Sequence, residues 1–252
     1  MRKLLEGLWI MERPHGCNTY LVGSRPDFVL VDAGTRADPA RMESQMLESG
    51  FLARDIRRIV ITHAHGDHLE GAPEMVRRSG ARILCSREEV PYVQDGRKMP
   101  TSSLFLRFID GACRLLCIRR ILCGVDEALE DGQLLEGTNL RVVSCPGHTP
   151  GSISLYDADR RILFCGDAMF NVNPLTGKAG LQVSIPAFTT DRAMALESVR
   201  MLSRLSVDIL LPGHGEPILE HGGERIRELL SQQDQPRRAA RRTCSEHRHV
   251  DA

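Results

Sequence analysis

Four side chains that commonly bind metal ions lie within six residues of one another near position 65. They form the pattern H-x-H-x-D-H, made of His63, His65, Asp67 and His68. Imidazole and carboxylate together suit a borderline divalent ion such as zinc, and also iron or manganese. A lone histidine is most often an inert surface residue, but this density of ligands is hard to explain without a metal. The segment therefore predicts a metal centre, to be tested against further ligands elsewhere in the chain.

The residues on either side of this motif predict the elements that must position it. Ile59-Val60-Ile61 has the length and the β-branching of a buried strand, and a stretch compatible with a helix follows over residues 69–78. The ligands therefore lie on a strand-to-helix turn at the end of a sheet. Gly66 lets the backbone bend there, so that the side chains converge on one point.

The same arrangement occurs at three later places in the chain. At each, an apolar stretch is followed by a glycine and one ligand-type side chain, which are His148, Asp167 and His214. A Gly-His or Gly-Asp pair is weak evidence alone. An earlier apolar stretch over residues 28–31 ends at Asp32, which is either a turn residue or a hydrogen-bond acceptor close to the ligands. The alternation of strands and helices predicts an α/β fold.

Composition narrows the class of protein. The 252 residues are 42% hydrophobic and 26% charged, and Lys plus Arg equal Asp plus Glu at 33 each, so no global charge favours nucleic acid. The eight cysteines are scattered without a C-x-x-C pair, which is typical of reduced residues in a cytoplasmic protein. Glu6 and Gly7 interrupt the apolar start of the chain, and no apolar segment is long enough to span a membrane.

The pattern of elements predicts one domain over residues 1–230. Residues 88–125 interrupt it as a helical insertion with a wide apolar stripe from Leu104 to Leu116. The simplest interpretation is a helix packed on its own domain. The alternatives are a lid that presents Phe105 or Phe108 to a hydrophobic substrate, or the surface of a homodimer. Residues 231–252 are polar and arginine-rich with no apolar period, which predicts a disordered tail.

Taken in order, the motifs H-x-H-x-D-H, G-H-T-P-G-S, G-D and P-G-H-G resemble those of the metallo-β-lactamase superfamily of metallohydrolases over about residues 1–230. The resemblance implies a four-layer αββα sandwich with the metal site at one edge of two mixed sheets. It implies one metal held by His63, His65 and His148, and a second held by Asp67, His68 and His214. Asp167 would bridge the two ions, and Asp32 would support the metal loop from outside.

Such a site has a definite chemistry. Three protein ligands and a bridge leave a position open on each ion for water and substrate. A hydroxide shared by two cations exists near neutral pH and can attack a carbonyl or phosphoryl centre. Asp67 is suited both to bind metal and to relay the proton. We therefore expect a cytoplasmic dinuclear hydrolase that acts through a metal-bridging hydroxide on a small ester, thioester or lactone.

The branches of the superfamily differ in ways that the sequence addresses. The catalytic core resembles that of glyoxalase II, but only 38 residues follow His214, too few for the helical region that grips glutathione in those enzymes. Lactonases of the superfamily share the seven ligands. In this sequence, however, Phe170 is the residue after Asp167-Ala168-Met169, and no tyrosine is placed there to assist the reaction. True β-lactamases generally lack the bridging aspartate, so Asp167 argues against that activity. No substrate-binding residue can be named from the sequence.

Other classes of protein remain as alternatives. A persulfide dioxygenase would hold a single iron with His63, His148 and Asp167 only. A nucleic-acid-processing phosphodiesterase of the same fold would need a basic arm or an added domain, and neither is evident in residues 1–230. A binding protein without activity would be expected to have lost ligands, whereas all seven are present.

Overall fold

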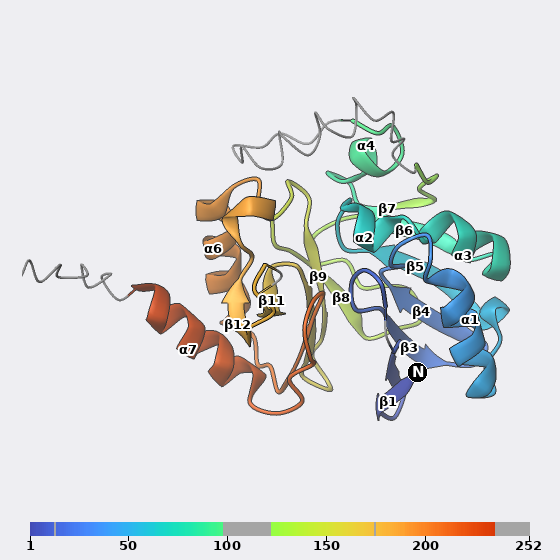
Figure 1. Ribbon diagram of the computed structural model, residues 1–252, viewed down its shortest axis with the longest axis horizontal. Helices are drawn as coiled ribbons and strands as arrows, with labels where there is room; N and C mark the ends of the chain where they lie inside the picture. The colour runs from blue at the N-terminus through green and yellow to red at the C-terminus, as the bar shows by residue number, and fades with distance from the viewer. Residues whose placement is uncertain (13, 98–121, 174, 235–252) are drawn as a thin grey trace, which may run out of the picture.

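The computed structural model describes residues 1–12, 14–97, 122–173 and 175–234, and Figure 1 shows their arrangement. The first sheet follows the chain in the order β1-β2-β3-β4-β5-β6-β7, with bounds Arg2–Leu5, Leu8–Ile10, Tyr20–Ser24, Asp27–Val31, Ile56–Ile61, Arg82–Ser86 and Glu127–Leu129. The pairs β1–β2, β2–β3 and β3–β4 are antiparallel, and the pairs β4–β5, β5–β6 and β6–β7 are parallel. This sheet is therefore mixed.

The second sheet has the order β13-β10-β9-β8, with bounds Ile209–Pro212, Ile162–Gly166, Ile153–Asp157 and Leu140–Ser144. Strands β8, β9 and β10 are antiparallel, and β10 is parallel to β13, so this sheet is also mixed. Strands β11 (Met169–Val172) and β12 (Ala179–Val183) form a separate antiparallel pair.

The two sheets face each other, and helices cover both outer faces. Helices α1 (Pro39–Glu48) and α3 (Ala72–Ser79) lie on the first sheet, and α6 (Arg192–Leu202) and α7 (Gly222–Asp234) on the second (Figure 1). The shorter elements are α2 (Gly66–Leu69), α4 (Val90–Val93) and two 3-10 turns, Ala53–Asp55 and Pro186–Phe188. The expected α/β fold of four αββα layers is confirmed.

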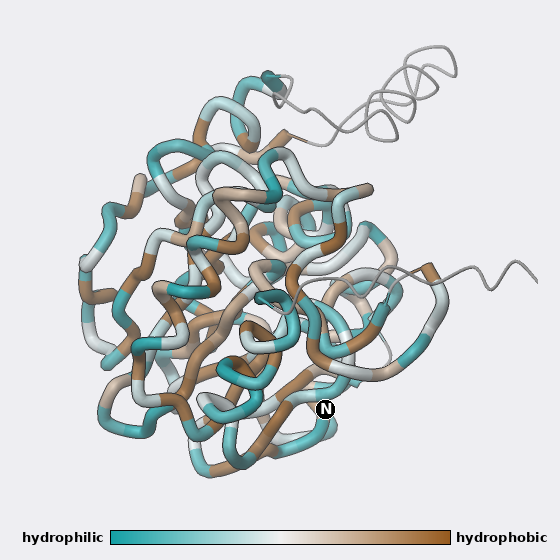
Figure 2. Tube along the Cα trace, turned by 90° about the vertical axis from the view of Figure 1, so that its left-hand side faces the viewer, coloured by the Kyte–Doolittle hydropathy of each residue, from teal (hydrophilic) through white to brown (hydrophobic). Residues whose placement is uncertain are grey.

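Side-chain alternation along the strands explains why this sandwich forms. In β5, Ile59 and Ile61 pack against the helices outside, whereas Val60 packs between the sheets. In β10, Phe164 points to the inner core and Leu163 to the outer one. A strand presents alternate residues to opposite faces, so strands that are apolar at every position become buried on both sides. Figure 2 shows hydrophobic stretches alternating with hydrophilic ones along the trace.

One predicted boundary differs in the structure, and another lies largely outside the described residues. The predicted disordered tail begins at 231, but α7 continues to Asp234, whose carboxylate accepts a hydrogen bond from the Arg200 guanidinium at 2.7 Å. Residues 235–252 lie outside the described part of the chain. Of the predicted insertion over 88–125, the structure describes only 88–97, which includes α4, and 122–125. The predicted lid or dimer helix at 104–116 therefore lies outside the described residues. No helix in the described segments is both long and apolar enough to cross a membrane.

Candidate metal centre

All seven predicted ligands follow the carboxyl ends of strands at one edge of the sandwich. His63, His65, Asp67 and His68 follow β5, and His148, Asp167 and His214 follow β8, β10 and β13. Asp32 directly follows β4, the parallel neighbour of β5. Strands β8, β10 and β13 run in the same direction, so their ends share an edge of the second sheet. The fold thereby brings together residues that are more than 150 positions apart.

Three imidazole rings form the first ligand group. His148 Nε2 lies 3.2 Å from His63 Nε2 and 2.9 Å from His65 Nδ1, and these last two atoms are 3.1 Å apart. Nitrogen atoms about 2.0–2.1 Å from one tetrahedral zinc would be separated by about 3.3 Å. The three nitrogens are thus close to the spacing that a single ion requires.

Asp67, His68 and His214 form the second ligand group. His214 Nε2 lies 3.2 Å from Asp67 Oδ2 and 3.4 Å from His68 Nε2. The His68 ring is fully buried, whereas the Asp67 side chain is 39% exposed and that of His214 is 21% exposed. His65 of the first group is also only half-buried, so ligands of both groups face solvent.

Asp167 lies between the two groups. Its Oδ2 is 3.3 Å from His148 Nε2 in the first group and 3.4 Å from His214 Nε2 in the second. Its Oδ1 is buried without a hydrogen-bond partner among the described residues. A buried carboxylate oxygen without a donor is costly, and a cation would satisfy it. The residues at this edge therefore fit two divalent ions with Asp167 between them.

Asp32 controls which nitrogen of two ligand rings carries the proton. Its Oδ2 lies 2.8 Å from His68 Nδ1 and accepts a hydrogen bond from the Thr62 hydroxyl at 2.9 Å. Because that hydroxyl donates to Asp32, its oxygen is left to accept from His63 Nδ1, 3.1 Å away. Protons on the Nδ1 atoms leave the Nε2 lone pairs of both rings free toward the ligand groups.

The protonation states of the ligands differ between the two groups in the metal-free chain. Burial lowers the pKa of His63 well below its ordinary value and that of His65 to about 3, so both rings are neutral at pH 7. Burial alone would raise the pKa values of Asp67 and Asp167, but His68 and His214 hold both well below the usual range.

The two rings of the second group hold a proton when no metal is bound. Burial would lower their pKa values, but Cys17 and the neighbouring carboxylates raise that of His68 well above its ordinary value, and Asp167 and Asp67 raise that of His214 to about 9. Because metal binds neutral imidazoles and ionised carboxylates, an ion at the second group would displace protons from these rings.

Two supporting contacts near the ligands were not predicted from the sequence. Asn18 donates through Nδ2 to the Pro212 carbonyl at 3.0 Å and to that of Gly215, and so holds the loop that carries His214. Phe170 is 1% exposed and packs edge-on against the His148 and His214 rings. Asn18 precedes β3, and the sequence around it carries no signal of such a contact, because its partners are almost 200 residues away.

A cysteine lies close to His68. Cys17, Asp32 and His68 have potential ligand atoms within 4.8 Å of one another. Burial raises the pKa of Cys17 to about 11, so its thiol is protonated at neutral pH in the metal-free chain. The trio shares His68 with the second ligand group, so it is not a separate cluster.

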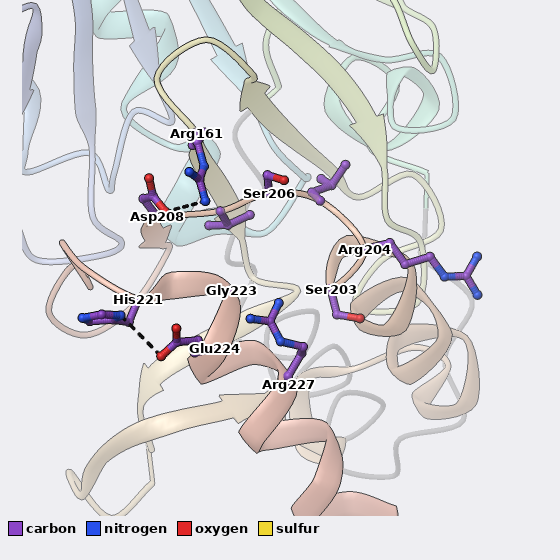
Figure 3. Close-up of a pocket in the computed structure, with 11 residues that line it drawn as sticks. Arg161, Ser203, Arg204, Ser206, Asp208, His221, Gly223, Glu224 and Arg227 are labelled. Carbon is purple, nitrogen blue, oxygen red and sulfur yellow. Dashed lines mark ion pairs between the residues drawn. The ribbon is translucent and has the colours of Figure 1, made fainter.

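A pocket of about 310 Å³ lies elsewhere, at the beginning of β10 and β13. Figure 3 shows Arg161 paired with Asp208 at 2.9 Å and His221 paired with Glu224 at 3.3 Å on its wall. Asp167 and His214 follow the other ends of the same two strands. The pocket is therefore separate from the candidate metal centre.

The chain is similar in sequence to several known proteins. A family model described as the metallo-beta-lactamase superfamily matches residues 13–214. The probable metallo-hydrolase YflN of Bacillus subtilis is 29% identical over 211 residues, which cover 76% of each chain. The human acyl-coenzyme A thioesterase MBLAC2 is 28% identical over 243 residues, with 88% of this chain and 82% of that protein covered.

Solved structures agree with the fold. The metallo-beta-lactamase family protein TTHA1429 of Thermus thermophilus has a TM-score of 0.66 and 25% identity, and the match covers 92% of this chain and 80% of that one. The subclass B3 enzyme BJP-1 of Bradyrhizobium japonicum also has a TM-score of 0.66, at 20% identity and with 92% and 91% covered. At that identity the second likeness concerns the fold alone.

Proposed function

The chain belongs to the metallo-beta-lactamase superfamily, and we propose that it is a dinuclear hydrolase that cleaves a small ester, thioester or lactone. Membership identifies it as a metallohydrolase, whereas the number of ions and the bond that is cleaved are our proposal. The observation that carries the proposal is the pair of ligand groups with Asp167 between them, its Oδ2 within 3.4 Å of a nitrogen from each.

Each side chain has one proposed task. His63, His65 and His148 hold the first ion, Asp67, His68 and His214 hold the second, and Asp167 contacts both. When bound, the two ions would lower the pKa of water toward neutrality and polarise the substrate carbonyl. We propose zinc for both positions, with iron or manganese as the other metals that this donor set accepts.

Asp67 is the residue that we propose handles the proton. Its carboxylate is ionised and 39% exposed, so it can accept a hydrogen bond from the attacking water and pass the proton to the leaving group. Phe170, which packs on His148 and His214, has no hydroxyl to share in that transfer. Substrate would approach from the solvent-facing side of the centre, where Asp67, His214 and His65 are partly exposed.

Among the three substrate classes we place thioesters first. The human relative named as an acyl-coenzyme A thioesterase matches 88% of this chain, which supports a thioester. A reducing, cytoplasmic location is part of the proposal, because the five described cysteines are buried free thiols.

The deciding experiment measures metal per chain in protein purified without added metal or an affinity tag, together with turnover of an acyl-coenzyme A, a glutathione thioester and an acyl-homoserine lactone. Two zinc ions per chain with thioester hydrolysis would support the proposal. One iron per chain with oxygen uptake on a persulfide would replace it with a dioxygenase. Cleavage of a phosphodiester with no action on the esters would indicate a nucleic-acid-processing enzyme instead.

A further inference from the structure

Glu89 is a fully buried carboxylate beside the first ligand group. It lies in the turn between β6 and α4, and none of its surface is exposed, whereas the adjacent Glu88 is exposed. A glutamate is rarely buried unless its charge is paired or fully hydrogen-bonded. The buried carboxylate of Glu89 therefore needs partners that compensate for its charge.

Three hydrogen bonds account for both carboxylate oxygens of Glu89. Oε2 accepts from the Ala64 backbone N–H at 2.8 Å. Oε1 accepts from the Thr149 hydroxyl at 2.7 Å and from the Gly151 backbone N–H at 2.8 Å. Burial raises the pKa of Glu89, and these donors oppose that rise. All three neighbours donate, so the site is built for a carboxylate acceptor.

The three donors to Glu89 lie in the two loops that carry the histidines of the first ligand group. Ala64 separates His63 from His65, and Thr149 directly follows His148. The first loop belongs to the seven-stranded sheet and the second to the four-stranded sheet. One side chain thus joins the two loops that supply every histidine of the first ligand group.

The local backbone is shaped for this contact. A Cβ atom on Gly151 would lie 2.6 Å from Ser86 Oγ and 2.8 Å from the Glu89 backbone nitrogen. Ser86 Oγ also donates to the Gly151 carbonyl at 2.5 Å. The absence of a side chain at position 151 lets the His148 loop lie directly against the turn that carries Glu89.

The second ligand group is held by other residues. Asp32 contacts His68, and Asn18 holds the loop of His214, whereas the hydrogen bonds of Glu89 go to Ala64, Thr149 and Gly151. Loss of Glu89 would therefore disturb the spacing of His148 from His63 and His65 without changing the contacts of the second group.

We propose that Glu89 is a positioning residue that fixes the two loops of the first ligand group against each other and selectively sets the metal affinity of that position. The inference rests on the proposed function only in that the seven ligands bind ions, and it does not depend on which substrate is cleaved. It predicts an asymmetric effect, in which one of the two metal positions weakens.

The test compares Glu89→Gln with Glu88→Gln, which makes the same change at an exposed neighbour. Glutamine has nearly the same volume, but its amide NH2 cannot accept from an N–H group, so one of the two loops loses its acceptor. Zinc binding is measured by competition with a chromophoric chelator, and cobalt absorption spectra report ligand geometry. His148→Ala and His214→Ala serve as references for loss of the first and second positions.

In Glu89→Gln we expect one zinc equivalent to bind about 10–100-fold more weakly, with a cobalt spectrum that moves toward that of His148→Ala. Glu88→Gln should bind both equivalents like the unmodified chain. Thr149→Val removes only the hydroxyl donor and should shift the same equivalent in the same direction by a smaller factor. If Glu89→Gln does not fold, Thr149→Val decides the question.

Two results would overturn the inference. One is unchanged affinity for both zinc equivalents. The other is equal weakening of both, together with a lower melting temperature of the metal-free variant, which would indicate a purely structural role. If the unmodified chain binds two ions but cleaves none of the offered substrates, the proposed function fails and this comparison still stands. If it binds no ion, both proposals fail.

Discussion

Asp167 is the side chain whose carboxylate directly contacts both ligand groups. Its Oδ2 contacts nitrogens from each group, and its Oδ1 has no hydrogen-bond donor among the described residues. Without metal, the carboxylate is a buried charge offset only by nearby histidines. Asp167 is therefore positioned to favour the metal-bound protein over the metal-free one.

We predict that Asp167→Ala lowers turnover at least about 100-fold and removes at least one metal per chain, because the contact between the two groups is lost. The core should stay folded, since the substitution deletes an unsatisfied buried group and leaves the sheets intact. Elemental analysis and circular dichroism check both parts. Full dinuclear occupancy with unchanged turnover would contradict the assigned role.

His214 gives the metal-free protein a distinct pH dependence. Burial lowers its pKa, but Asp167 and Asp67 raise it, with a net value of about 9. An unfolded histidine titrates near about 6.5. Between these two values the folded chain binds a proton that the unfolded chain does not, so its stabilising effect is complete below about 6.5 and is lost toward 9.

We therefore predict that the free energy of unfolding of the metal-free protein decreases between pH 6.5 and 9, with about 2 kcal/mol of the decrease due to His214. Denaturant titrations at several pH values in the presence of a chelator measure it. The His214→Gln variant should show a shallower decrease. Equal slopes for the two proteins would show that this ring does not carry the proton.

The sequence predicted residues that the structure brings together at one edge, but it did not predict the residues that support them, for a physical reason. Ligand-type side chains after apolar runs are visible along the chain, and a glycine directly precedes His148, Asp167 and His214. Glu88 and Glu89 are the same residue type side by side, yet one is exposed and one is buried. Only contacts with residues 64, 149 and 151 distinguish them, and those depend on the tertiary fold.

Among the secondary-structure elements too, local sequence patterns predicted some features and missed those that depend on tertiary contacts. The strand predicted at residues 59–61 is the buried end of β5, as its β-branching indicated. The helical stretch predicted over 69–78 is divided between α2 and α3 at Gly71, where a Cβ atom would overlap the Ala33 carbonyl oxygen. That close approach comes from a loop after β4, which periodicity within the helix cannot reveal.

The loop after β13 depends on one glycine in a similar way. A Cβ atom on Gly213 would overlap Asp167 Oδ1 and would lie 2.9 Å from His68 Cε1. We predict that Gly213→Ala displaces Asp167 and weakens metal binding at least about 10-fold, at a cost of about 1–3 kcal/mol in stability. Zinc competition and thermal unfolding measure the two effects.

The matched control is Gly124→Ala. Among the described residues, nothing lies within 4 Å of the Cβ position of Gly124, so this variant should bind metal and unfold like the unmodified chain. If Gly213→Ala behaved in the same way, the loop would be free to move, and the close approach would not constrain Asp167.

At the scale of the whole molecule, the predicted ligands come from both sheets. Four of the seven follow β5 in the first sheet, and three follow strands of the second. Strand patterns predicted that such sheets exist, but the resemblance to a family, not the local patterns, predicted how they face each other. How the two sheets face each other is set by which side chains pack between them. Val60 of the first sheet, for example, lies in the same inner core as Phe164 of the second.

Because the ions would join residues from both sheets, we predict that metal stabilises the whole sandwich. An ion present at about 100 times its dissociation constant adds about 2.7 kcal/mol, which for a chain of this size corresponds to roughly 5–10 °C in melting temperature. Chelation should lower the melting temperature by about that amount and abolish hydrolysis, and added zinc should restore both.

Hydrogen exchange should quicken on chelation in the backbone amides of residues 62–68, 147–151 and 213–215, the loops at the shared edge, and change little in α3 on the outer face. A melting temperature that is the same with and without metal would mean that the two sheets are held together by their apolar core alone, and that the seven side chains converge without an ion between them.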